Sequence, residues 1–294
     1  RPVSPQLYSI TVMLPLLFLL RPAWLNQYLC PISVKIKASN SPWLKEIFLP
    51  QITIFMDNRH FSYKEWERLK HFIPPFGWMT LNYTGQSYSN TKLHAPRCVS
   101  CAVVGNGGIL NGSRLGKEIN EHDYVFRLNG AVTKGYERDV GNRTSFYGFT
   151  ASTVISSLHY LRTEGFPNIP ISAVKKPPRY IFGSSFNLNK LLVAHPDFTR
   201  YVKDRYLRSK TLKSKYWAIY RPTTGALVLL TALHLCDTVS AYGFMTEDYK
   251  SYSNHYYDKY KKEMILYANH DFLLEKNLWR YLHQENIMKL YQRT

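Results

Sequence analysis

A chain of 294 residues with 45% apolar residues can bury one large hydrophobic core, and its length permits one or two domains. The sequence has no internal repeat or low-complexity tract, which excludes a repeat array. The formal net charge of +18 predicts an anionic partner from one of three classes, namely nucleic acid, membrane headgroups or a charged small substrate.

The N-terminal part contains a largely apolar run of 14 residues, Leu7–Leu20, which Arg21 and Pro22 close. A helix that spans a bilayer needs roughly 20 apolar residues, so this run is short for a span and is more typical of a signal-like core or a buried segment. Because the chain begins at Arg1 without a methionine, we interpret it as a fragment that lacks its N-terminus and any membrane anchor there.

A compact region is predicted to begin at Ser41, where Ser41-Pro42 is a plausible helix start. Residues Phe48–Phe55 are a strand candidate. In Ser62–Phe72, Ser62 followed three residues later by Glu65 is typical of a capping box, and the apolar residues behind it have helical spacing. Pro74-Pro75 is expected to end this helix.

The next segment predicts a parallel crossover unit. A short apolar strand at Ala102–Val104 leads into the loop Gly105-Asn106-Gly107-Gly108, and a polar helix near Ser113–Asn120 follows. A second strand, Tyr124–Leu128, then runs into Asn129-Gly130, and Ser145–Phe149 is another strand candidate. Strand, loop, helix and strand together form the minimal parallel unit.

The glycine-rich loop is typical of a nucleotide or phosphate site, because glycines let backbone N–H groups approach an anion beside a helix start. It is not a dinucleotide fingerprint, since Leu110 occupies the position of the third glycine in G-x-G-x-x-G. The alternative interpretation is an ordinary tight turn between a strand and a helix.

The second half predicts another unit of this kind. After a proline- and lysine-containing linker at Pro167–Pro178 and a short strand at Tyr180–Phe182, a basic helix is expected over Arg200–Lys215. Arg221–Ala226 opens an apolar helix that reaches Leu235, and Thr238–Gly243 reads as a strand. Two such units favour an α/β fold with one doubly wound sheet and a ligand at the strand ends.

Several polar residues outside the first loop are candidates for chemistry. Thr223, Thr224 and Gly225 fall in the first turn of the apolar helix, where hydroxyls and free N–H groups suit an anion, although a threonine there is also an ordinary N-cap. His255 and His270 are two of 10 histidines and suit proton transfer. No Asp-x-Asp motif occurs, which argues against a metal clamp on a nucleotide diphosphate.

The four cysteines favour disulfides over zinc. Cys98-x-x-Cys101 lacks the second pair that a zinc ribbon needs, and His94 alone is not a persuasive extra ligand. Asn82, Asn111 and Asn142 head Asn-x-Ser/Thr sequons, which are compatible with passage through the secretory pathway, where four cysteines can form two disulfides.

Four segments in this order resemble the motifs of the animal sialyltransferases, glycosyltransferase family 29. Cys101–Thr150 resembles the large sialylmotif, Arg221–Thr246 the small one, His255–Asp258 the third and His270–Glu275 the very small one. Shorter stretches resemble the branch that sialylates GalNAc on mucin-type glycoproteins, namely Ser41–Leu44, Pro74–Gly77, Phe146–Phe149 and Arg221–Gly225. The resemblance extends roughly from Cys30 to the C-terminus.

This resemblance implies a single GT-A-like, Rossmann-type α/β domain with a mostly parallel central sheet flanked by helices. Residues 41–294 are expected to form the catalytic domain, and residues 1–40 are expected to be a poorly ordered remnant of a stem or anchor. It further implies a luminal catalytic domain at the Golgi membrane, held by an N-terminal anchor missing here, and no nucleic-acid partner.

The implied reaction is the inverting transfer of sialic acid from CMP-sialic acid to O6 of GalNAc on Ser/Thr of a glycoprotein, without a metal or other cofactor. His270 matches the general base, and His255 matches the residue that binds the departing phosphate. Asn106, Gly107 and Asn129 are expected to hold the cytidine nucleotide. Phosphate, cytosine or carboxylate contacts are expected from Thr223, Thr224 and Gly225. The implied disulfides are Cys101–Cys236 and Cys30–Cys98, and Glu275 is expected to orient its surroundings.

Two alternatives stay open at the level of sequence. The segment 151–220 is shorter than in that branch, so one alternative is a protein that binds CMP but has an incomplete acceptor site. The other is a basic nucleic-acid-binding module, which the charge permits and which predicts binding that weakens steeply with salt.

Overall fold

The computed structural model of the chain describes residues 11–15, 30–57, 60, 62–79, 98–166 and 191–293. The predicted linker at 167–178, the predicted strand at 180–182 and the sequon asparagine Asn82 lie outside these residues.

One seven-stranded sheet has the strand order β5-β1-β4-β3-β2-β6-β7. Its five parallel strands are β2 (Ser100–Val104), β3 (Tyr124–Leu128), β4 (Phe146–Thr150), β6 (Thr238–Tyr242) and β7 (Lys289–Leu290). At the other edge β1 (Thr11–Pro15) pairs antiparallel with β4 and with β5 (Leu192–Val193). The mostly parallel α/β sheet is confirmed.

The central strands are buried on both faces, and alternate residues serve different cores. In β2, Cys101 and Val103 pack into the larger core, whereas Ala102 and Val104 face the smaller one. This alternation follows from the two-residue period of a strand, and the continuous apolar run follows from burial of both faces.

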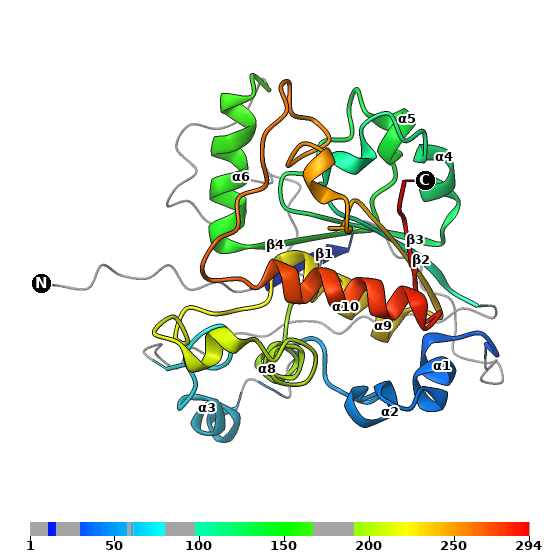
Figure 1. Ribbon diagram of the computed structural model, residues 1–294. Coiled ribbons are helices and arrows are strands. Elements are labelled where there is room, and N and C mark those ends of the chain that lie inside the picture. Colours follow the sequence, from blue (N-terminus) through cyan, green and yellow to red (C-terminus); the bar gives the residue numbers. More distant parts are fainter. Residues whose placement is uncertain are drawn as a thin grey trace, which may run out of the picture.

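Helices cover the two faces of the sheet (Figure 1). One layer contains α4 (Gly116–Glu121), α5 (Glu137–Val140) and α6 (Ala151–Thr163). The opposite side holds α1 (Val34–Asn40), α2 (Leu44–Ile47), α3 (Tyr63–Leu69), α8 (Pro196–Tyr201), α9 (Thr224–Leu235) and α10 (Phe272–Gln284). Helix α9 is apolar and buried nearly all round because it lies within the larger core.

Local signals placed several helix starts correctly. Ser62 caps α3 by accepting a hydrogen bond from the Glu65 N–H at 3.2 Å, and Thr223 caps α9 by accepting one from the Ala226 N–H at 3.0 Å. The strand expected at Phe48–Phe55 is wrong. Apart from one bridge between Phe55 and Ala194, the stretch forms no ladder, and Pro50 has no N–H to donate to one.

The single basic helix expected at Arg200–Lys215 is also wrong. Helix α8 ends at Tyr201, a π turn covers Val202–Tyr206, and a separate 3-10 turn covers Lys210–Lys213. At the end of α8 the Tyr201 hydroxyl lies within hydrogen-bond distance of the Tyr206 hydroxyl (3.2 Å) and of Nε2 of His234 (3.0 Å). These bonds fix the point where the helix ends inside the core. The positive charges therefore do not share one helix face.

Described residues on both sides of the boundary expected at residue 41 share one core. Val34 and Ala38 of α1 are buried in the larger core, and β1 contributes to the sheet. Within the described ranges no helix is long and apolar enough to cross a membrane.

The structure contains the two disulfides that the resemblance implies. Cys101 at the start of β2 is joined to Cys236 at the end of α9, and Cys30 is joined to Cys98. Both residues of the first pair are buried, so this bond ties the two crossover units together inside the protein.

Candidate active site

The glycine loop after β2 packs against the end of β6. The N–H of Gly105 donates to the Tyr242 carbonyl at 2.7 Å, and the N–H of Gly107 donates to the Gly243 carbonyl at 3.0 Å. A Cβ on Gly107 would lie 2.6 Å from that carbonyl oxygen, so only glycine permits the approach. The Gly107 N–H is therefore donated within the protein, and contact of Gly107 with the cytidine nucleotide stays a prediction.

The third motif docks on the same loop. The N–H of Gly108 donates to the Ser253 carbonyl at 3.1 Å, and the Tyr256 N–H donates to the Asn106 carbonyl at 3.0 Å. The loop therefore links the end of β6 to the third motif. The N–H groups of its three glycines, Gly105, Gly107 and Gly108, are all donated within the protein. These contacts place the backbone next to His255 against Asn106.

Two asparagine side chains carry buried atoms without hydrogen-bond partners at the strand ends. Nδ2 of Asn106 donates to the Leu128 carbonyl at 3.3 Å, which points Oδ1 away from that carbonyl. Oδ1 of Asn106 and Oδ1 of Asn129 are buried and accept no hydrogen bond in the described part of the chain. Leaving a buried polar atom unpaired costs about 1 to 3 kcal/mol, so both oxygens suit a ligand that donates hydrogen bonds.

The start of α9 is fixed by a buried carboxyl group. Glu275 accepts hydrogen bonds from the Thr223 N–H at 2.9 Å and from the Thr223 hydroxyl at 2.6 Å. Burial raises the pKa of Glu275 to about 7, although both hydrogen bonds act in the opposite direction. The Thr223 hydroxyl also accepts from the Ala226 N–H. The contact of Thr223, Thr224 and Gly225 with the donor stays a prediction.

His270 lies beside this helix start with one ring nitrogen already assigned. Its Nδ1 is 2.8 Å from the Arg221 carbonyl oxygen, which can only accept, so Nδ1 carries a proton and Nε2 keeps its lone pair. The amide Nδ2 of Asn269 approaches Nε2 at 3.3 Å. Burial lowers the pKa of His270 to about 4, and the backbone hydrogen bond opposes this shift. The side chain is therefore neutral at neutral pH.

His255 is held by an acidic and aromatic cluster. Its Nδ1 lies 3.4 Å from Oδ1 of Asp258, and its ring stacks on Tyr257 with 5.0 Å between centroids. Burial acts to raise the pKa of Asp258, but hydrogen bonds from His255, Ser253 and Tyr160 outweigh it and hold that pKa well below its usual range. The carboxylate beside Nδ1 and the stacked Tyr257 ring fix the orientation of the imidazole.

Sequence reasoning missed two residues of this cluster. The hydroxyl of Tyr160, on α6, donates to Asp258, and Nζ of Lys262 lies 3.3 Å from the same hydroxyl. Since Tyr160 is 98 residues from Asp258, no local pattern could have connected them.

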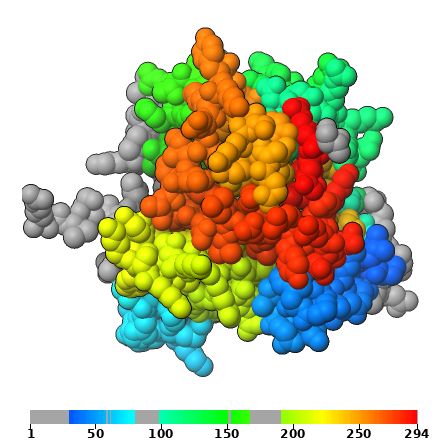
Figure 2. Space-filling model, in the orientation of Figure 1, coloured from blue at the N-terminus to red at the C-terminus, as the bar shows by residue number. Residues whose placement is uncertain are grey.

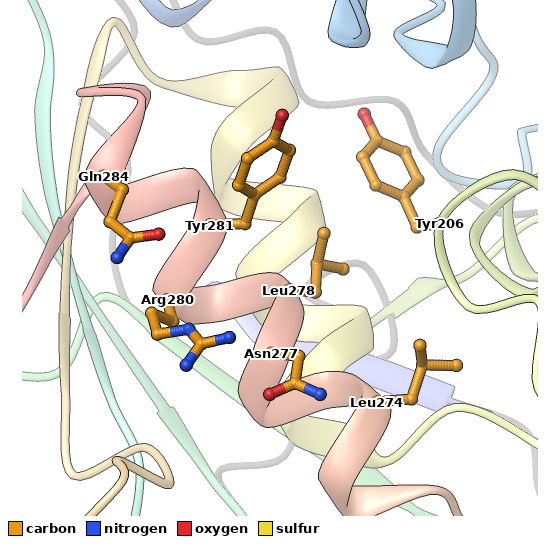
Figure 3. A pocket seen from close by; sticks show the side chains of 7 residues that line it. All are labelled: Tyr206, Leu274, Asn277, Leu278, Arg280, Tyr281 and Gln284. Atoms are coloured by element: carbon orange, nitrogen blue, oxygen red, sulfur yellow. The ribbon is translucent and has the colours of Figure 1, made fainter.

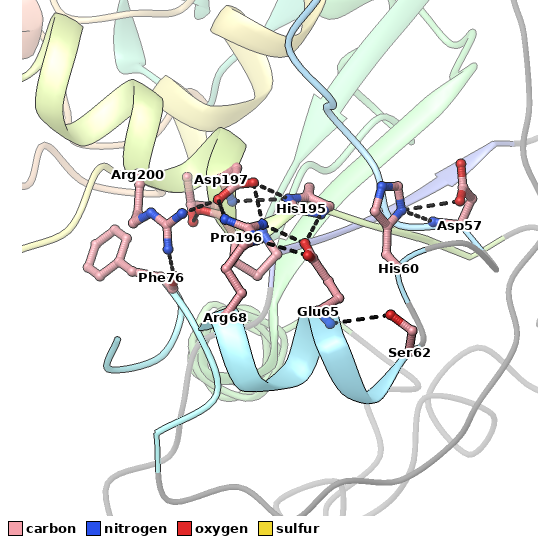
Figure 4. A network of polar contacts seen from close by, with 11 residues as sticks. Asp57, His60, Ser62, Glu65, Arg68, Phe76, His195, Pro196, Asp197 and Arg200 are labelled. Atoms are coloured by element: carbon pink, nitrogen blue, oxygen red, sulfur yellow. Dashed lines mark hydrogen bonds and ion pairs between the residues drawn. The ribbon is translucent and has the colours of Figure 1, made fainter. Parts of the chain in front are cut away.

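Three side chains lie close enough together to bind one metal ion, namely those of Glu65, His195 and Asp197. Two arginines, however, already bind the two carboxylates of this group (Figure 4). Arg68 donates to both Glu65 and Asp197, and Arg200 donates to Asp197. His195 accepts a hydrogen bond from the Asp197 N–H through Nδ1. A guanidinium between the carboxylates already supplies the positive charge, so this network fastens α3 to α8 and is a poor cation site.

A surface pocket of about 340 Å³ runs along α10 (Figure 3). Its lining consists of Tyr206, Leu274, Asn277, Leu278, Arg280, Tyr281 and Gln284. None of the predicted site residues lines it, and it contains no carboxylate or histidine. The residues predicted for chemistry, Asn106, Asn129, His255 and His270, therefore all lie outside this pocket.

Comparisons with known proteins identify the family that the motifs resemble. The family model "Glycosyltransferase family 29 (sialyltransferase)" matches residues 55–287. The chain belongs to this family. The alpha-N-acetylgalactosaminide alpha-2,6-sialyltransferase 1 of Gallus gallus is 50% identical over 90% of this chain and 55% of its own length. The enzyme of that name from Homo sapiens is 49% identical over 91% of this chain and 52% of its length.

This sialyltransferase chain thus spans about half the length of the curated relatives it matches. A crystal structure of a mammalian sialyltransferase superposes with a TM-score of 0.54 and 24% identity, covering 86% of this chain and 95% of that chain. That likeness confirms the expected GT-A-like sialyltransferase fold.

Proposed function

We propose that the chain transfers sialic acid from CMP-sialic acid to O6 of GalNAc linked to Ser or Thr of a glycoprotein. The observation that carries the proposal is the neutral His270, whose Nδ1 proton is committed to the Arg221 carbonyl. Its Nε2 keeps the basic lone pair, which only the long 3.3 Å contact with the Asn269 amide approaches, and the acceptor hydroxyl is proposed to replace that contact. Relatives at 49–50% identity that are named for a GalNAc α-2,6 reaction support the substrate class.

In this reaction Nε2 of His270 accepts the proton of the acceptor O6 hydroxyl as that oxygen attacks the anomeric carbon of sialic acid. The bond from this carbon to the phosphate oxygen breaks at the same time, and attack from the opposite side inverts the anomeric centre. A positioned base typically contributes about 10²- to 10⁴-fold to such a step.

His255 is proposed to stabilise the departing CMP phosphate. Its Nδ1 lies 3.4 Å from Oδ1 of Asp258, so the opposite ring nitrogen, Nε2, is the one left to contact a phosphate oxygen. A hydrogen bond to a developing charge stabilises the transition state more than the ground state. The orphan N–H groups of Thr224 and Gly225 at the start of α9 add positive potential for the phosphate or the donor carboxylate.

The cytidine nucleotide is proposed to satisfy the unpaired Oδ1 atoms of Asn106 and Asn129. Nucleosides offer hydroxyl and amine donors, which these oxygens require. Gly107 contributes through its lack of a side chain and not through its N–H.

The direct test is transfer from CMP-sialic acid to a peptide carrying one GalNAc on Thr, with a chelator present. Sialylated product whose new linkage is at O6 supports the proposal. Binding of CMP without transfer to any acceptor selects the CMP-binding alternative, and salt-sensitive binding to nucleic acid without CMP binding rejects the proposal altogether.

Asn106→Ala is expected to raise KM for CMP-sialic acid by about tenfold or more with a smaller effect on kcat, because a buried hydrogen bond to the bound nucleotide is lost. Initial rates at varied donor concentration measure this change. Asn277→Ala removes an exposed asparagine of α10 and is the matched control. An unchanged KM in Asn106→Ala contradicts the assigned role.

The proposed setting is the Golgi lumen, with glycoprotein acceptors and an N-terminal membrane anchor. The two disulfides support an oxidising compartment. Both described sequon asparagines, Asn111 and Asn142, are exposed. Nδ2 of Asn111 already donates to the Tyr256 carbonyl at 2.7 Å, so Asn142 is the better candidate for glycosylation.

A further inference from the structure

Two surface segments meet beside His270. Residues 209–221 and 265–273 are joined by a hydrogen bond from the Arg221 N–H to the Asn269 carbonyl at 3.0 Å. A second bond links the Ser209 hydroxyl to Oδ2 of Asp271 at 2.6 Å. The space-filling view shows the two segments side by side, in yellow and orange-red (Figure 2).

These segments carry a concentration of exposed apolar side chains. Six of the 12 large apolar residues that are exposed in the described chain belong to them, with Trp217 at 58% and Tyr267 at 56% exposure. We call this set the apolar rim; its members are Tyr216, Trp217, Ile265, Leu266, Tyr267 and Leu273. Exposed apolar groups that cluster in this way mark interaction surfaces more often than scattered ones do.

The position of the rim indicates what covers it. The following step rests on the proposed function, in which Nε2 of His270 reaches the acceptor O6 within hydrogen-bond distance. GalNAc is a single sugar attached directly to Ser or Thr, so the polypeptide must pass within one sugar ring of His270. Tyr267 lies three residues before His270, and its carbonyl accepts the His270 N–H at 3.0 Å. The Arg221 carbonyl, which holds the His270 ring, lies four residues after Trp217.

We propose that the apolar rim binds the polypeptide of the acceptor on either side of the glycosylated Ser or Thr. Extended, proline-containing chains present ring faces and short apolar side chains, and exposed aromatic rings bind these without requiring a folded partner. The rim therefore selects acceptors by their peptide sequence, whereas the strand-end groups select the donor.

The test compares two acceptors, a GalNAc-bearing peptide with proline and apolar residues beside the modified threonine, and methyl α-GalNAc, which has no peptide. The double variant Trp217→Ala/Tyr267→Ala removes two exposed rings and leaves the backbone hydrogen bonds around His270 in place. We expect the ratio of kcat/KM for the peptide acceptor to kcat/KM for methyl α-GalNAc to fall about tenfold. The control double variant Ile32→Ala/Tyr63→Ala removes equally exposed side chains elsewhere and should keep the wild-type ratio.

An unchanged ratio in the rim variant overturns the proposal while the proposed function stands. A rim variant that keeps the ratio but loses binding to phosphatidylcholine/phosphatidylserine vesicles reassigns the rim to a membrane surface. If the wild-type chain transfers to neither acceptor, the proposed function itself fails and the proposal fails with it. Circular dichroism of both double variants verifies that each is folded.

Discussion

His270→Ala is expected to lower kcat for sialic acid transfer by about 10²- to 10⁴-fold, because it removes the group that accepts the O6 proton. Affinity for CMP should change little, since Nε2 of His270 is assigned to the acceptor and not to the nucleotide. Single-turnover rates and CMP binding by calorimetry measure the two effects. Added imidazole should restore part of the rate in the alanine variant, which a purely structural defect would not permit.

His71→Ala is the matched control, because His71 is an exposed histidine beyond the end of α3. It should transfer at the wild-type rate. A His270→Ala enzyme that retains more than about a tenth of the wild-type kcat contradicts a general-base role.

The pH profile gives an independent check on His270. Burial lowers its pKa to about 4 from an ordinary 6.5, and only the neutral ring is a base. Activity is therefore present above the folded-state pKa and is lost as the pH falls through it. Because burial raises the pKa of Glu275 to about 7, the profile is measured in Glu275→Gln, where that group cannot titrate. There we expect kcat/KM for the acceptor to stay level from about pH 7 to about pH 5 and to fall below that. An acid limb centred near 6.5 is the result that contradicts this environment.

The fold was predictable where short-range patterns decide the structure. Tyr124–Leu128 is a strand with the predicted bounds because an apolar run buried on both faces has few other stable conformations. Patterns failed where the partner is distant. Phe48–Phe55 has strand-like composition but, within the described residues, pairs only at its end through the bridge from Phe55 to Ala194. The basic segment after Arg200 bends because Tyr201 bonds to His234 across the core.

The candidate site shows the same division. His255, His270 and Asn106 were predicted from motifs whose residues lie close together in the chain. The use of the Gly107 N–H could not be foreseen, because its acceptor, Gly243, is brought to it only by the pairing of β2 with β6. A motif therefore identifies which loop forms the site, and the tertiary contacts decide which atoms remain for the ligand.

Removal of the Cys101–Cys236 disulfide is expected to cause the largest loss of stability. The bond closes a loop with a sequence separation of 135 residues, and restricting the unfolded chain in this way contributes about 5 kcal/mol in the chain-entropy model. Both cysteines are buried, so replacing them with alanine also removes packing around β2 and α9. The free energy of unfolding of Cys101→Ala/Cys236→Ala in urea measures the loss.

The second disulfide provides the comparison. Cys30→Ala/Cys98→Ala opens a loop of 68 residues, for which the same model gives a loss smaller by only about 0.6 kcal/mol. The two bonds differ more in function, since only Cys101 lies in the strand that leads to Asn106. We therefore expect CMP affinity to fall in the Cys101/Cys236 variant and to persist in the Cys30/Cys98 variant when both are assayed under conditions in which they are folded. Equal CMP affinities would mean that hydrogen bonds between the glycine loop and β6 hold the site without the disulfide.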